Sequence, residues 1–229
     1  MEADFKLQLN ELRAQALQTQ MNPHFIFNSL NAIQHFLTTQ DKENAMLYLA
    51  RFAKLIRFIF EHSKQKTISL RKELEFLKLY LSLEKLRFEG KVETTTHIEA
   101  NILGKEDEIH LPPLLIQPLV ENAFKHGLFH KNGEGNLYVS FSYTDPILEC
   151  IIVDDGVGRK KAAKMNQWKK RHHKSSGIKS TKERIELLNK TVATDITPKE
   201  NQFKIIDLSD EFGNALGTKV MIKLKNQLV

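Results

Sequence analysis

The sequence contains a single cysteine, Cys150, among its 229 residues. One thiol per chain excludes an internal disulfide framework and a cysteine-rich metal site, and it favours a reducing, cytoplasmic environment. No apolar run approaches the roughly 20 residues that a membrane-spanning helix needs. The N-terminal stretch MEADFKLQLNELRAQ also lacks the apolar core of a signal peptide. The net charge of +6 permits an anionic partner without saying which kind.

Glycine and proline are nearly missing from the N-terminal third, since residues 3–62 contain Pro23 and no glycine. Apolar residues recur every three to four positions over 5–16, as in a coiled-coil seam, and this stripe resumes after Pro23. The pattern predicts a further helix over 42–62 with apolar residues on two sides. Because both sides need cover, we expect an antiparallel hairpin that pairs with a second copy as a four-helix bundle.

A third helix is expected between Ser69 and Gly90, and the composition changes after it. Segments rich in β-branched and aromatic residues then alternate with polar turns and with two helical patterns. This layout predicts an α+β fold, in which helices pack on one face of a mixed sheet in a two-layer α/β sandwich. We place the domain boundary near 90, which gives a helical unit at 1–90 and a second unit at 91–229. The expected strands are 91–100, 137–143, 147–153, 205–208 and 219–224; the expected helices are 112–127 and 178–190; and a long basic loop is expected at 154–176.

The first unusual motif is Asn22-Pro23-His24-Phe25. A proline inside a helix removes a hydrogen bond and kinks the axis, which could lift the His24 imidazole away from a bundle surface. Neutral imidazole is a competent nucleophile toward phosphorus near pH 7. The alternative is that Asn22-Pro23 starts a new helix and leaves His24 as a solvated residue of its first turn.

The second motif is ENAFKHG, residues 121–127. Helical spacing places Glu121 beside Lys125, and Asn122 beside His126 on the adjacent side. A carboxylate, an amide, an ammonium and an imidazole within two turns suit a magnesium–phosphate site, because Mg²⁺ takes few protein oxygens and keeps phosphates and waters. The alternative is a polar helix face with a weak Glu–Lys pair.

The third motif, DDGVG at 154–158, follows an apolar strand. A carboxylate there can accept a hydrogen bond from an exocyclic amine such as that of adenine, and glycines let a backbone approach a ligand closely. An ordinary turn is the alternative. The basic stretch at 159–174 could close over phosphates or contact nucleic acid, or it could be a solvated loop.

Taken in order, these motifs resemble the catalytic region of LytS/YehU-type sensor histidine kinases, over about residues 10–225. The stretches that carry the resemblance are QTQMNPHFIFNSLN, SLRKELEFLKLYLSLEKLRF, LPPLLIQPLVENAFKHG, VDDGVG, KERIELLN and LGTKVMIKL. The second unit is similar to the GHKL (Bergerat) ATP-binding fold. The resemblance implies that the chain is a two-component protein histidine kinase that uses ATP and Mg²⁺, phosphorylates a histidine, and passes the phosphoryl group to an aspartate of a response regulator, often of the LytTR type.

The resemblance also implies a role for individual residues. His24 matches the phosphoacceptor, Asn122 matches the Mg²⁺-binding asparagine, and Glu121 matches a carboxylate kept by related ATPases. The remaining matches are Lys125 and His126 on the phosphate side, Asp154 at the adenine amine, Gly156 and Gly158 in the first glycine box, Gly177 in the second, and Thr218 behind the adenine pocket.

Two features depart from the family pattern. The second glycine box reads Ser175-Ser176-Gly177 where relatives often have a further glycine. Phe25 follows His24 where other histidine kinases place a carboxylate base, although a phenylalanine there is usual in the family that the chain resembles. The base is therefore not identified. We expect a homodimer, and we expect the cytoplasmic portion of a longer, membrane-anchored sensor. The alternative is a nucleotide-binding pseudokinase that binds a regulator without phosphorylating itself.

Overall fold

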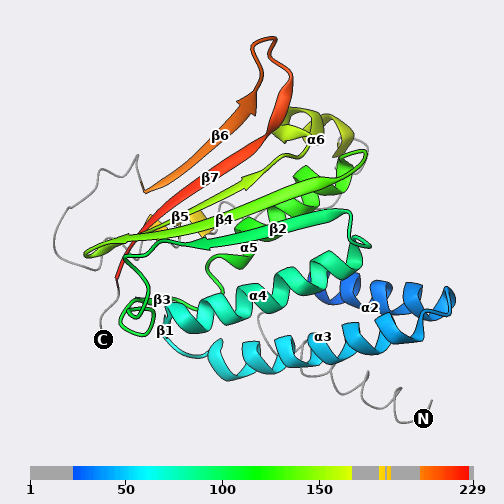
Figure 1. Ribbon diagram of the computed structural model, residues 1–229, viewed down its shortest axis with the longest axis horizontal. Coiled ribbons are helices and arrows are strands. Elements are labelled where there is room, and N and C mark those ends of the chain that lie inside the picture. Colours follow the sequence, from blue (N-terminus) through cyan, green and yellow to red (C-terminus); the bar gives the residue numbers. More distant parts are fainter. Residues whose placement is uncertain (1–22, 167–180, 184, 187–201, 227–229) are drawn as a thin grey trace.

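The computed structural model describes residues 23–166, 181–183, 185–186 and 202–226 (Figure 1). Two layers are visible: a sheet, and a set of helices beneath it. Within the described part of the chain, no helix is long and apolar enough to cross a membrane.

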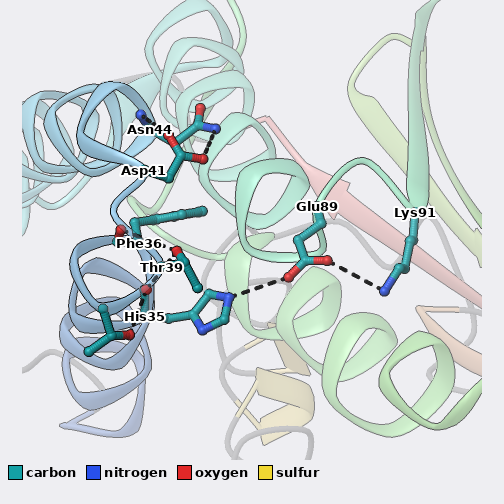
Figure 2. Close-up of polar contacts among 8 residues, drawn as sticks. His35, Phe36, Thr39, Asp41, Asn44, Glu89 and Lys91 are labelled. Carbon is teal, nitrogen blue, oxygen red and sulfur yellow. Dashed lines mark hydrogen bonds and ion pairs between the residues drawn. The ribbon is translucent and has the colours of Figure 1, made fainter.

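The N-terminal helices α2 (Pro23–Thr38) and α3 (Lys42–His62) lie side by side, as the sequence predicted (Figure 1). The turn between them ends at Asp41, which caps α3 by accepting a hydrogen bond from the Asn44 backbone N–H at 3.1 Å. Figure 2 shows this cap beside Phe36 and Thr39 at the end of α2.

The two apolar stripes of α3 have different surroundings. One stripe is buried against the rest of the chain and consists of Tyr48, Phe52, Leu55 and Ile59. The other leaves Met46 70% exposed and Phe60 48% exposed. The same side also contains the buried Ile56, so a single chain covers one apolar side of the helix and leaves the other partly exposed.

Helix α4 (Leu70–Arg87) is joined to the sheet layer from its first residue onward. The short strand β1 (Ile68–Ser69) pairs with β3 (His110–Leu111) immediately before the helix begins. In the first turn of the helix, the buried Glu73 carboxylate accepts the backbone N–H groups of Leu114 and Ile116 at 3.0 and 3.1 Å. Positive φ angles at Glu89 and Gly90 end α4 where the sequence predicted.

Five strands form a mixed sheet in the order β2-β4-β5-β7-β6. The β2–β4 pair is parallel and the other pairs are antiparallel, and the apolar β5 lies at the centre, as expected. One face is buried under the helices through alternate residues such as Val139, Cys150 and Ile222. These findings confirm the α+β fold class. The strands are β2 (Val92–Ile98), β4 (Gly135–Thr144), β5 (Ile147–Asp154), β6 (Phe203–Ser209) and β7 (Ala215–Lys225).

The helix predicted at 112–127 is divided. Helix α5 (Gln117–Asn122) begins five residues later than expected, with Pro118 in its first turn, where no backbone N–H is needed. A π-helical turn, η1 (Ala123–Gly127), and a 3-10 turn, η2 (Leu128–His130), continue it. The helix is therefore irregular at η1, and π-helical turns occur frequently at functional sites.

The prediction of a basic loop at 154–176 is wrong for its first half, because Gly158–Asn166 forms helix α6. Lysine, arginine and alanine favour helix, and Ala162 buries its side chain while Arg159 pairs with Asp207 of β6 at 2.6 Å. Residues 167–180 lie outside the described part of the chain. Of the helix predicted at 178–190, only 181–183 and 185–186 are described, and they are helical.

Candidate functional site

The candidate site is built around a buried carboxylate at the end of the central strand. Asp154 is the last residue of β5, is 4% exposed, and its Oδ1 accepts the Gly156 backbone N–H at 3.0 Å. Thr218 lies opposite it on β7 and is also buried. Burial raises the pKa of Asp154 to about 6, against the opposing effect of the backbone hydrogen bonds from Gly156 and Thr218.

Three glycines pack so closely on one another and on Asp154 that none of them could carry a side chain. A Cβ added at Gly127 would lie 2.4 Å from Asp154 Oδ1, and one added at Gly156 would lie 2.3 Å from the Gly127 carbonyl carbon. At Gly217, which has a φ of +132°, a Cβ would lie 1.8 Å from the Asp154 backbone oxygen. The three glycines and Asp154 thus form a glycine cradle, which joins the KHG, DDGVG and LGTKV segments.

The π-helical turn positions the end of the ENAFKHG motif at this cradle. The Leu128 N–H bonds back to the Ala123 carbonyl, five residues earlier, and the Val157 N–H bonds to the Gly127 carbonyl at 3.2 Å. Gly158, with a φ of +74°, starts α6 next to Ala215. The structure therefore brings Gly156, Gly158 and Thr218 together with Asp154.

Asn122 ends α5, half-buried, with its amide group oriented by the helix itself. Its Nδ2 donates to the Pro118 carbonyl at 2.5 Å, so its Oδ1 is the atom suited to a cation. No cluster of three or more histidine, cysteine or acidic side chains able to hold a metal occurs among the described residues. A single amide oxygen nevertheless suits Mg²⁺ bound to phosphates, because that ion uses few protein ligands.

A second group of predicted residues lines a cavity of about 320 Å³ beneath α5 and η1. Glu121, Lys125 and His126 form one wall, and Phe25 and Asn28 of α2 form another. The structure thus brings residues of the NPHFIFN and ENAFKHG motifs to one cavity. The other lining residues are Tyr80, Glu84, Arg87, Phe129 and His130.

His24 is the second residue of α2, directly before Phe25 and one turn before Asn28. Its side chain lies outside the described part of the structure, as do the preceding residues that would show whether the helix is kinked at Pro23. Gly177, with the rest of the second glycine box, also lies outside the described residues.

Sequence reasoning missed two charged residues of this cavity. Glu84 is 2% exposed, and its Oε2 pairs with Nη2 of Arg87 three residues later. Burial raises the pKa of Glu84 to about 7, against the attraction of Arg87 and the Tyr80 hydroxyl. In the sequence both look like exposed charges of an amphipathic helix; only the tertiary structure shows that Glu84 is buried and that both residues line the cavity.

Comparison with known proteins gives the class. A family model described as histidine kinase matches residues 12–92. Among solved structures, the chain is similar to the histidine kinase domain of a blue-light activated histidine kinase from Erythrobacter litoralis, with 13% identity, a TM-score of 0.46, and coverage of 97% of this chain and 95% of that one. The resemblance to histidine kinases inferred from the motifs is thereby confirmed.

Within that class, the relatives are LytS sensor proteins. The chain is 34% identical over 150 residues to sensor protein LytS of Oceanobacillus iheyensis, covering 66% of this chain and 25% of that protein. It is 36% identical over 151 residues to the sensor histidine kinase/phosphatase LytS of Staphylococcus aureus, again covering 66% and 25%. The chain therefore spans about a quarter of the length of the curated relatives it matches.

Proposed function

We propose that this chain is the ATP-dependent catalytic portion of a two-component sensor histidine kinase. The observation that carries the proposal is the cavity lined jointly by α2, which contains His24, and by the ENAFKHG segment. A phosphoacceptor helix and a phosphate-binding segment must meet for direct transfer, because the reacting atoms need to approach within about 3.5 Å.

In this proposal the nucleotide binds on the sandwich, which has the layout of a Bergerat ATP-binding fold. The Asp154 carboxylate accepts a hydrogen bond from the adenine amine, and the glycine cradle gives the ring close access to the backbone. Asn122 Oδ1 holds Mg²⁺, while Lys125 and His126 contact phosphate oxygens. The Mg²⁺ ion neutralises charge on the phosphates, so the task of the chain is mainly positioning and electrostatic stabilisation.

The transfer itself exchanges one bond to phosphorus for another. An imidazole nitrogen of His24 forms a bond to the γ-phosphorus as the bond to the bridging oxygen breaks, and the electron pair leaves on ADP. The neutral ring loses its other N–H proton to its surroundings. Glu121, in the same cavity, is our candidate for a carboxylate that assists the reaction.

We further propose a division into a helical unit at 1–90, which dimerises and carries His24, and an ATP-binding unit at 91–229. The exposed apolar side of the hairpin supports a homodimer, because it places large apolar residues in solvent. These exposed residues are Phe27, Leu37, Met46, Leu47 and Phe60. A response-regulator partner, of the LytTR type, and a cytoplasmic position in a membrane-anchored sensor complete the proposal.

Incorporation of label from γ-labelled ATP tests the activity. We expect acid-labile, alkali-stable label on the wild-type chain and none on His24→Gln. We expect a strong loss of label on Asn122→Asp, because a negatively charged carboxylate then replaces the neutral amide at the Mg²⁺–phosphate site. His35→Gln, which removes another histidine from α2, is the matched control and retains the label. Failure to bind adenine nucleotides, or label on another residue, would contradict the proposal. Intact ATP binding without label would favour the pseudokinase instead.

A further inference from the structure

The last turn of α4 presents a fixed guanidinium to the cavity between α2 and ENAFKHG. Arg87 is ion-paired with Glu84, whose side chain is only 3% exposed, and its guanidinium lies 5.1 Å from the centre of the Phe88 ring. The Arg87 side chain nevertheless retains 21% exposure and lines the cavity. Two contacts therefore fix the group while part of it stays open.

Stability alone does not account for this ion pair. Removing two charges from water is costly, and a well-packed apolar pair of similar size is often at least as stable. The surroundings would suit such a pair, because the buried Phe25 and Tyr80 line the same cavity. An anionic ligand that binds the open side of the Arg87 guanidinium would explain why a charged residue is present here.

The other groups of the cavity indicate what kind of ligand that is. Lys125 and His126 lie on the ENAFKHG wall beside the carboxylate of Glu121, His130 follows them, and Asn28 comes from α2. Arg87 also lines the adjoining cavity of about 360 Å³ with Asn28, so it stands between the two α2-facing spaces. Cationic and hydrogen-bond-donating groups that converge from two sides match the several oxygens of a phosphoryl group, and arginine offers a planar fork of donors to it.

We propose that Arg87 is a further phosphoryl-binding residue of the transfer reaction, and that Glu84 is the residue that positions it. This inference rests on the proposed kinase function. Arg87 donates hydrogen bonds to the non-bridging oxygens of the phosphoryl group as it passes from the ENAFKHG side toward α2. It transfers no proton and forms no covalent bond, and Glu84 acts only by holding one edge of the guanidinium.

The test separates phosphoryl transfer from ATP binding in the full chain. We expect Arg87→Ala to lower the rate of His24 labelling by about 100-fold or more, as for loss of one preorganised donor to a developing charge. The ATP dissociation constant should stay within about threefold, because Arg87 does not touch the glycine cradle. Arg87→Lys keeps the charge but lacks the fork and should recover little of the rate, whereas guanidinium added to Arg87→Ala should restore part of it.

Two further variants complete the design. Glu84→Gln should slow labelling by about tenfold, which is less than the effect of Arg87→Ala, because the guanidinium remains but is held less firmly. Lys85→Ala is the matched control: it removes a cation from the same turn, one that pairs with the exposed Glu93 at 2.8 Å, and should label at the wild-type rate.

Wild-type labelling by Arg87→Ala would overturn the inference and leave the kinase function standing. Unfolding of both Arg87→Ala and Arg87→Lys, seen as a lost thermal transition, would also overturn it, because the pair would then be structural. Absence of label on the wild-type chain would instead overturn the proposed function itself.

Discussion

Asp154 and Glu84 are both buried carboxylates with a pKa raised by burial, to about 6 and about 7, yet their surroundings differ. Asp154 lies among glycines and receives backbone N–H groups, while the nearby cation Lys131 is paired with Asp155. Glu84 lies among aromatic side chains and is paired with Arg87. One carboxylate is stabilised by the main chain and the other by an internal ion pair.

This difference indicates what each carboxylate can do. Backbone N–H groups use some of the lone pairs of the Asp154 carboxylate and leave others for a donor on a ligand, such as an amine. Glu84 already has its cation, so its contribution is to fix the position of Arg87. Glycine-lined burial therefore suits recognition of a ligand, while ion-paired burial suits positioning of a second side chain.

The glycine cradle should be the more fragile of the two regions. Gly217→Ala is expected to lower the free energy of unfolding by about 3 kcal/mol or more, because its Cβ would meet the Asp154 backbone oxygen at a position with positive φ. Gly213→Ala, with a φ of +79° and nothing within 4 Å, is the matched control and should cost about 1 kcal/mol. Urea denaturation measures both; equal losses would show that the cradle is not tightly packed.

The pH dependence of stability should report on Glu84. Its pKa is higher in the folded chain than the ordinary 4.5, so the folded state holds the proton more tightly. The contribution of Glu84 to the free energy of unfolding is complete below about pH 4.5 and is lost as the pH rises through about 7. The loss amounts to about 3 kcal/mol.

Glu84→Gln should remove the Glu84 share of this decline and leave the smaller share of Asp154, whose pKa is also raised, as seen in urea denaturation at pH 5 and pH 8. Glu75→Gln, which makes the same change at an exposed position of α4, should keep it. A decline of the same size in Glu84→Gln and the wild-type chain would show that another group is responsible.

Asp154→Asn should weaken ATP binding by about tenfold or more and leave the fold intact. The amide keeps one oxygen for the Gly156 N–H but places an NH₂ group where the ligand amine would donate. Asp155→Asn is the control, because that carboxylate is already used by Lys131 and Asn136 at 2.9 and 2.8 Å. Calorimetric titration with an ATP analogue measures both, and similar affinities would remove Asp154 from the adenine site.

An exposed carboxylate gives the smallest effect. Glu89 pairs with His35 of α2 at 3.5 Å and with Lys91 at 3.5 Å, and all three groups lie in solvent (Figure 2). Glu89→Gln should change the free energy of unfolding by less than about 0.5 kcal/mol, measured by urea denaturation at pH 6. A loss as large as that of a buried pair would mean that this contact fastens the hairpin to the sandwich.

Local pattern was sufficient wherever a segment's own residues decide its structure. The helix predicted at 42–62 is confirmed to the residue, and Val92–Ile98, Gly135–Thr144 and Ile147–Asp154 form strands where β-branched and aromatic residues predicted them. The prediction failed at 112–127 and 154–176. There proline position, the close approach of Gly127 to Asp154, and burial of Ala162 on neighbouring elements override the local signal.

The candidate site divides in the same way. Asp154, Gly156, Asn122 and Lys125 were identified from motifs, and their arrangement is compatible with the proposed roles, which stay predictions. Glu84 and Arg87 have no such signal, because burial of a charged helix residue depends on what packs over it. The domain boundary at 90 also stays a prediction, since α4 contacts both α3 and β2.

The sequence by itself determined the chemical groups, the order of the elements and the α+β class, because side-chain periodicity and turn residues act over a few positions. Only the tertiary structure decided which groups share a space. Contact between α2, α4 and the ENAFKHG segment depends on long-range packing, and that packing converts Glu84 from an apparent surface charge into a buried carboxylate, paired with an Arg87 that stays partly open to the cavity.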